Sequence, residues 1–98
     1  MNKFEVMDHN EIVINHDQPK RSRNILTKYE KTTIIGVRIE QLAYGSPTTL
    51  SDDDKKLCTN IRDIAELELK RLVIPFMVCR HLPNKTDEYW KIKDFIIL

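Results

Sequence analysis

The spacing of hydrophobic residues between Thr27 and Gly45 predicts a helix with two apolar sides. At about 100° per residue, one side carries Ile35, Ile39, Leu42 and Ala43. The nearly opposite side carries Ile34, Val37 and Tyr44, with Arg38 and Lys31 on a ridge between the two sides. An ordinary surface helix has one apolar side that packs on the core. This helix has two, so each apolar side must be buried against a different part of this chain or of a partner. The rest of the domain could supply both covers, but we favour a partner protein over the second side.

Both ends of this helix are marked in the sequence. Thr27 and Glu30 have the spacing of a capping box, in which each side chain binds a free backbone N–H at the start of the helix. Gly45, with Pro47 just beyond it, marks the end. Gly36 lies inside the helix and costs it about 1 kcal/mol relative to alanine. We therefore expect another backbone to approach the helix closely at Gly36.

A second helix is predicted to begin after Asn60, a good N-cap, and to end before Pro75. Its apolar residues fall on one side: Ile61, Ile64, Ala65, Leu69 and Leu72. The three aspartates at 52–54 lack the spacing of a calcium loop. Ser51 as the cap of a short helical turn accounts for them.

Alternating residues at 76–82 and 87–92, joined by a turn at 83–86, predict a β-hairpin. The run at 12–14 predicts a short strand within an extended segment, residues 1–24. The predicted fold class is therefore α+β. Two main helices pack together and precede a C-terminal hairpin in a domain at 25–98, with an extended N-terminal lead-in.

Composition limits the possible functions. The 98 residues are 41% hydrophobic and 32% charged, which is typical of a globular domain, and the net charge of +1 gives no bulk attraction for nucleic acid. No apolar run approaches the roughly 20 residues of a membrane span. Two cysteines without a framework of close spacings favour a reducing compartment. We expect a soluble, intracellular protein.

The sequence offers little catalytic chemistry. Cys79 and His81 lie on one face of a strand, but Cys58, His9 and His16 do not complete a zinc set with them. There is no recognisable nucleophile motif and no phosphate-binding loop. Core packing explains Trp90 better than stacking on nucleic acid does. We expect no catalytic residue, no cofactor and no metal.

The ordered motifs resemble a known family. The first helix carries Leu26-Thr27-Lys28-Tyr29-Glu30-Lys31, Gly36-Val37-Arg38, Gln41-Leu42-Ala43 and Pro47. The remainder carries Asp63-Ile64-Ala65, Glu68-Leu69, Ile74-Pro75, Arg80, Leu82-Pro83 and Trp90. Over residues 24–98 this set resembles the smallest common subunit of cellular RNA polymerases, which is omega in bacteria, K in archaea and the shared sixth subunit in nuclei. The chain departs from the usual family pattern at three positions. The family usually has aspartate at the position of Asn60, proline at Ile61 and a basic residue at Val73.

The resemblance implies a non-catalytic subunit of DNA-directed RNA polymerase. Such subunits latch the C-terminal part of the largest subunit and promote assembly, and they meet nucleic acid only through the complex. The partner interface expected from the resemblance comprises Tyr29, Glu30, Ile34, Arg38, Gln41, Tyr44 and Arg80. Arg38 could bind a carboxylate or backbone carbonyls of the partner, or could pair within its own helix.

Two alternatives stay open. A free-standing nucleic-acid-binding or adaptor module could use the basic residues at 20–31. The divergence also resembles the versions encoded by large DNA viruses, and an unusual cellular lineage stays open as the other origin. The protein would then act at the site of transcription, in a nucleus or in a viral factory or virion.

Overall fold

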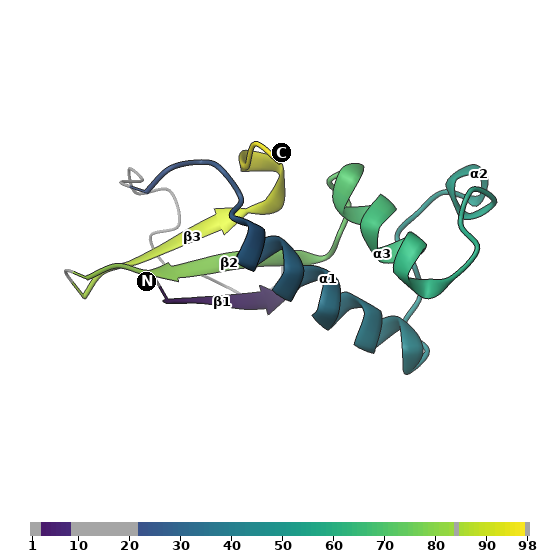
Figure 1. The fold of residues 1–98 in the computed structure, drawn as a ribbon, viewed down its shortest axis with the longest axis horizontal. Coiled ribbons are helices and arrows are strands. Elements are labelled where there is room, and N and C mark those ends of the chain that lie inside the picture. Colours follow the sequence, from purple (N-terminus) through teal and green to yellow (C-terminus); the bar gives the residue numbers. More distant parts are fainter. Residues whose placement is uncertain (1–2, 9–21, 84, 98) are drawn as a thin grey trace. The chain divides into compact units, whose positions relative to one another are not determined.

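The computed structural model describes residues 3–8, 22–83 and 85–97, and it confirms the predicted α+β class (Figure 1). The chain divides into two compact units. Residues 28–74 form a helical unit, and residues 1–27 with 75–98 form a unit built on a β-sheet. The predicted strand at 12–14 lies outside the described residues.

The helical unit contains α1 (Lys28–Ala43), α2 (Asp52–Lys55) and α3 (Ile61–Lys70), and α1 packs against α3. The starts of α2 and α3 follow the predicted caps. The Asn60 side chain accepts a hydrogen bond from the backbone N–H of Asp63 at 2.9 Å, and Ser51 accepts one from Asp54 at 3.3 Å. Each oxygen binds one of the N–H groups that a helix start leaves without an internal partner.

The end of α1 is also as predicted. Gly45 has a φ of +99°, and its N–H donates to the carbonyl of Leu42 at 3.1 Å. The N–H of Ser46 donates to the carbonyl of Gln41 at 3.1 Å. This pair of bonds needs a left-handed residue, which glycine adopts without the clash that a Cβ atom brings.

α3 ends before Pro75, as predicted, but Leu72 lies beyond its last residue. Leu72 has a φ of +60° and donates its N–H to Leu69, while Val73 donates to Glu68, each at 3.0 Å. The pattern is the one that ends α1, with leucine in the position that favours glycine. The left-handed turn carries Leu72 off the apolar side of α3, and its side chain is exposed.

The sheet has the order β1-β2-β3, with every neighbouring pair antiparallel (Figure 1). β2 (Phe76–His81) and β3 (Asp87–Lys91) form the predicted hairpin. β1 (Lys3–Asp8) is a strand that the sequence analysis did not predict. Val6 lies opposite Val78, which lies opposite Trp90, whereas Glu5, Cys79 and Tyr89 align on the other face.

The apolar face of the sheet holds the core of its unit. Phe76, Val78, Trp90 and Phe95 are buried, and η1 (Ile92–Asp94) follows β3 directly. Residues 24–26 run beside the end of the chain, since Leu26 donates its N–H to Ile96 at 3.2 Å and Ile96 donates to Asn24 at 2.7 Å.

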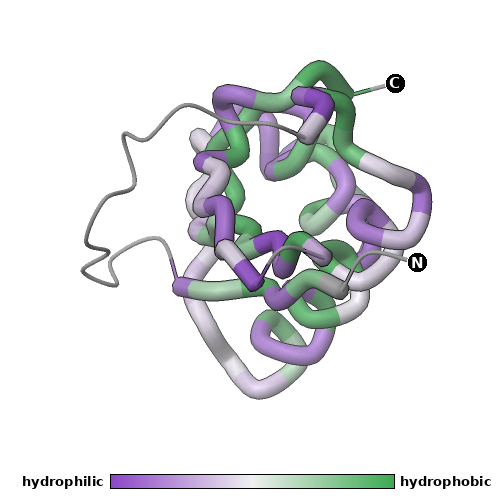
Figure 2. Tube along the Cα trace, turned by 90° about the vertical axis from the view of Figure 1, so that its left-hand side faces the viewer, coloured by the Kyte–Doolittle hydropathy of each residue, from purple (hydrophilic) through white to green (hydrophobic). Residues whose placement is uncertain are grey.

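Hydrophobic and hydrophilic residues are interspersed along the trace (Figure 2). Within the described ranges, no helix has the length and apolar character needed to span a bilayer.

We expect substitution by alanine to have opposite effects on stability at the two glycines. Gly45→Ala should lower the free energy of unfolding by about 1 to 2 kcal/mol, because alanine is strained at positive φ. Gly36→Ala should raise it by about 1 kcal/mol, because a Cβ at this helical position meets no atom within 4 Å. Urea denaturation of the two variants measures both changes, and a loss of stability in each would contradict the contrast.

Candidate subunit interface

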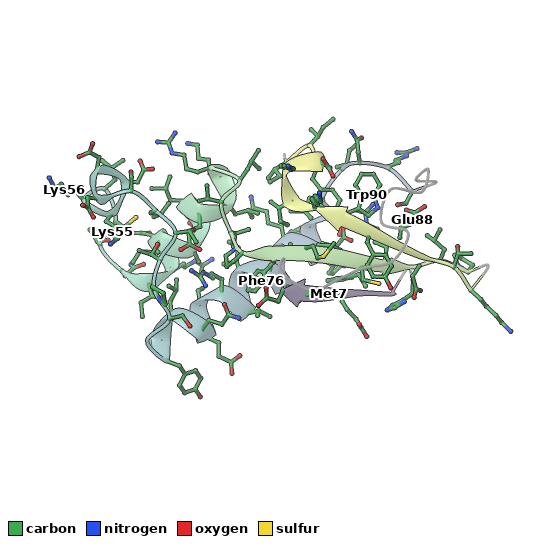
Figure 3. The ribbon with its side chains drawn as sticks, turned by 180° about the vertical axis from the view of Figure 1, so that it is seen from behind. Met7, Lys55, Lys56, Phe76, Glu88 and Trp90 are labelled. Carbon is green, nitrogen blue, oxygen red and sulfur yellow. The ribbon has the colours of Figure 1, made fainter. Side chains whose placement is uncertain are left out.

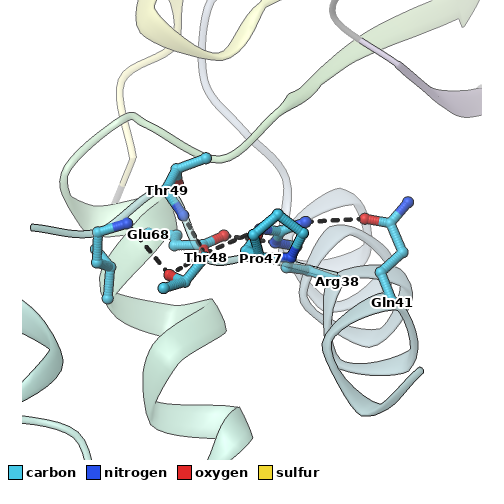
Figure 4. A network of polar contacts seen from close by, with 7 residues as sticks. Arg38, Gln41, Pro47, Thr48, Thr49 and Glu68 are labelled. Atoms are coloured by element: carbon cyan, nitrogen blue, oxygen red, sulfur yellow. Dashed lines mark hydrogen bonds and ion pairs between the residues drawn. The ribbon is translucent and has the colours of Figure 1, made fainter. Parts of the chain in front are cut away.

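A buried ion pair joins α1 to α3 (Figure 4). The Nε of Arg38 donates to Oε1 of Glu68 at 2.6 Å, and its Nη2 donates to Oε2 at 3.1 Å. The two side chains are only 3% and 0% exposed. Two parallel bonds of this kind match the planar guanidinium to the carboxylate and fix the orientation of both groups.

Further hydrogen bonds from the same unit complete this network (Figure 4). Arg38 also donates to the Gln41 side chain at 3.0 Å and to the carbonyl of Pro47 at 2.9 Å. Glu68 also accepts from the Thr48 hydroxyl at 2.7 Å and from the Thr49 N–H at 3.2 Å. The pair therefore fixes the loop after α1 as well as the two helices. Burying two charges costs several kcal/mol, and such complete hydrogen bonding is what makes it tolerable.

The chain buries residues on both of the predicted apolar sides of α1. The buried residues of α1 are Glu30, Ile34, Ile35 and Arg38. Glu30, Ile34 and Arg38 follow one another at helical spacing on the side that the sequence analysis assigned to a partner. Ile34 is fully buried, so the expectation that a partner must cover this residue is wrong.

The seven residues expected at the interface fall into three groups. Tyr29 and Tyr44, at the two ends of α1, are 69% and 84% exposed. Gln41 is half-buried and binds Arg38. The other four residues are buried: Glu30, Ile34, Arg38 and Arg80. In the free chain, the two tyrosines therefore offer a partner the most surface.

The other apolar side of α1 borders a groove. A hollow of about 440 Å³ lies between α1 and α3, and Ile35, Gly36 and Ile39 contribute to its lining. Within the described part of the chain, and apart from the neighbouring residues and backbone of α1 itself, no atom lies within 4 Å of where a Gly36 side chain would begin. The chain's own backbone thus does not make the close approach that we expected at Gly36, and the groove leaves room for another chain.

The rim of this groove is mainly basic. Lys28 and Lys31 line it from α1, and Arg62 and Glu66 line it from α3. Arg62 donates to Glu66 at 3.1 Å, and both side chains are well exposed. Because the charges of Arg62 and Glu66 offset each other, the two lysines give the rim a net positive charge.

Arg80 holds the segment that precedes α1 against the sheet of its unit. Its Nη1 donates to the Ser22 hydroxyl at 3.1 Å and to the carbonyl of Arg23 at 2.5 Å, and its Nη2 donates to Ile25 at 2.9 Å. The guanidinium also lies over the rings of Trp90 and Phe95, 5.4 and 4.9 Å from their centroids. The Arg80 side chain is therefore a positioning group inside this unit.

Glu88 completes this second cluster, directly opposite Arg80 in the β2–β3 pair. Figure 3 shows Glu88 and Trp90 along β3, and the Trp90 Nε1 donates to Glu88 at 3.2 Å. The hydroxyl and the N–H of Ser22 also donate to the Glu88 carboxylate. Trp90 stacks on Phe95 with ring centroids 5.1 Å apart, and both are buried, which confirms that Trp90 packs in the core.

Glu68 is the central residue that the sequence analysis missed as a site. Its helical position lies between Ile64 and Leu69 on the apolar side of α3, where an unpaired carboxylate would be costly. An acidic residue on the apolar side of a helix indicates that a buried cationic side chain pairs with it. Arg38, on the ridge of α1, could have been predicted as that partner.

Removing either member of the buried pair should strongly destabilise the chain. Arg38→Met or Glu68→Leu should each lower the free energy of unfolding by about 3 to 5 kcal/mol, because the remaining charge stays buried without its counterpart. The variant with both substitutions should lose much less free energy of unfolding than the two single variants lose together. A double-mutant cycle by urea denaturation measures the coupling, and additive losses would show that the two side chains do not depend on each other.

Comparison with known proteins agrees with the sequence motifs. The family model described as RNA polymerase Rpb6 matches residues 21–68. The DNA-directed RNA polymerases II and V subunit 6B of Arabidopsis thaliana is 30% identical over 80 residues, which cover 82% of this chain and 54% of that protein.

Two archaeal relatives are more similar over shorter lengths. The DNA-directed RNA polymerase subunit Rpo6 of Saccharolobus islandicus is 42% identical over 62 residues, covering 63% of this chain and 64% of the relative. The Rpo6 of Aeropyrum pernix is 43% identical over 59 residues, covering 60% and 65%. The chain thus spans 54 to 65% of the length of these curated relatives. The resemblance predicted from the motifs is confirmed, and the chain belongs to the RNA polymerase Rpb6 family.

Proposed function

We propose that this protein is a non-catalytic subunit of a multisubunit DNA-directed RNA polymerase. In this proposal it latches the C-terminal region of the largest subunit and promotes assembly of the enzyme at the site of transcription. The names of its relatives support the general role, because they are polymerase subunits. The observation that carries the specific role is the groove beside Gly36, where an apolar side of α1 borders open space.

The shape of the groove favours an extended or helical segment of a partner chain. The half-buried Ile39 offers an apolar contact, and Gly36 presents no side chain. A partner backbone can therefore lie closer to α1 at this point than it could over any other residue type. A glycine that weakens its own helix is well explained by such a contact.

The charge of the rim selects among such segments. Lys28 and Lys31 favour a segment with acidic side chains, because opposite charges steer association and exclude wrong partners. We propose that an acidic stretch of the largest subunit occupies the groove.

The exposed tyrosines would extend this interface at both ends of α1. Tyrosine supplies a large contact area with few rotatable bonds and is frequent among residues that dominate binding energy. The buried Glu30, Ile34 and Arg38, together with the half-buried Gln41, would then act by fixing α1 in its unit. Arg80 would act in the same way on the segment before α1.

Filling the groove should separate binding from folding. Gly36→Leu should leave the free energy of unfolding near that of Gly36→Ala but weaken association with the largest subunit by at least about tenfold, or about 1.4 kcal/mol. The measurement is co-expression of tagged chain with the polymerase subunits, followed by affinity purification and quantitative mass spectrometry. Lys56→Leu, an exposed change outside the groove lining, is the matched control.

The same purification distinguishes the nucleic-acid alternative. If Gly36→Leu recovered the largest subunit as well as the wild-type chain did, the groove would not be the latch. A pure chain that bound oligonucleotides with a steep salt dependence, lost in Lys28→Glu and Lys31→Glu, would instead favour a stand-alone nucleic-acid-binding module.

A further inference from the structure

One face of the sheet gathers polar side chains that the proposed polymerase role does not use. In the β2–β3 pair His81 lies opposite Asp87, and in the β1–β2 pair Cys79 lies opposite Glu5. Cys79 and His81 are two residues apart, so both side chains point to the same face. This alignment places a sulfur, a nitrogen and carboxylate oxygens on neighbouring positions of the three strands.

The potential ligand atoms lie close together. One ligand atom from each of Cys79, His81 and Asp87 lies within 4.8 Å of the other two. The Nδ1 of His81 is 2.7 Å from Oδ1 of Asp87, and its Nε2 is 3.7 Å from a carboxylate oxygen of Glu5. Among the residues that the structure describes, this is the group that combines three such ligand types.

We propose that Cys79, His81 and Asp87 form a binding site for a zinc-like divalent cation. Thiolate, imidazole and carboxylate are the three ligand types that zinc takes from proteins, at distances of about 2.0 to 2.3 Å. A tetrahedral site would bring ligand atoms to about 3.3 to 3.8 Å from one another. Small side-chain rotations from the present separations reach that geometry, and water supplies the fourth ligand.

The surroundings of Cys79 suit a cation better than they suit a reactive thiol. Cys79 is buried, Glu5 lies opposite it in the β1–β2 pair, and the Asp87 carboxylate lies within 4.8 Å of its sulfur. A bound cation would replace the thiol proton and offset the negative charge of the carboxylates. Tyr89 faces Cys79 from β3, and its phenol supplies no competing positive charge.

An ordinary ion pair does not account for the whole cluster. The side chains of His81 and Asp87 are 35% and 44% exposed, and such pairs contribute little to stability. The ion pair also has no need of the thiol. A metal bound by all three residues would join β2 to β3 beside the hairpin turn, so binding would stabilise the sheet unit.

Cobalt(II) titration of the full-length chain, kept reduced with a phosphine, tests the site directly. The expected result is one cobalt per chain with a thiolate-to-cobalt charge-transfer band, and zinc should displace it. Cys79→Ser should abolish the band, whereas the matched control Cys58→Ser should keep it. Asp87→Asn, at an exposed position that leaves folding intact, should weaken binding by about 100-fold.

Two results would overturn the site. One is the absence of a charge-transfer band in the folded wild-type chain, shown to be folded by circular dichroism. The other is a band that survives Cys79→Ser or that disappears with Cys58→Ser. Cobalt binding that Asp87→Asn leaves unchanged would remove Asp87 from the ligand set and reduce the proposal to a two-residue contact.

Discussion

The helical unit depends on one buried contact, the ion pair of Arg38 and Glu68. A guanidinium and a carboxylate that lose their water must find all their hydrogen bonds inside the protein. The pair meets this requirement through Gln41, the carbonyl of Pro47, and Thr48 and Thr49. This requirement fixes the rotation of α1, its distance from α3 and the course of the loop between α1 and α2.

The rotation of α1 decides which of its two apolar sides the chain covers. With Arg38 directed to Glu68, Ile34 is buried, and Ile35 and Ile39 line the groove. Ile35 is itself buried, so the surface that α1 leaves for a partner on this side lies around the half-buried Ile39 and Gly36. In the proposed function, the internal ion pair sets the orientation of α1, and that orientation presents the groove to the partner. Arg80 and Glu88 play the corresponding internal role in the sheet unit.

The features predicted correctly from the sequence are those set by local chemistry. Caps at Ser51 and Asn60, the left-handed Gly45 and the hairpin each depend on residues a few positions apart. The errors concern long-range partners. β1 joins the sheet through pairing with β2, which no local pattern encodes, and Arg38 meets a partner 30 positions away. Leu72 takes a left-handed turn without the glycine that would have marked it. Asp87 became a ligand candidate only when the strand register placed it opposite His81.

The central claim is that the groove between α1 and α3 faces the largest polymerase subunit. Site-specific photo-crosslinking in the assembled polymerase tests it most directly, with a benzophenone amino acid placed at Thr32 in the groove lining or at Leu57, which is exposed outside it. The account predicts that Thr32 crosslinks to an acidic segment in the C-terminal region of the largest subunit and that Leu57 gives no such product. Crosslinks from Leu57 alone, or from Thr32 only to other subunits or to nucleic acid, would contradict it.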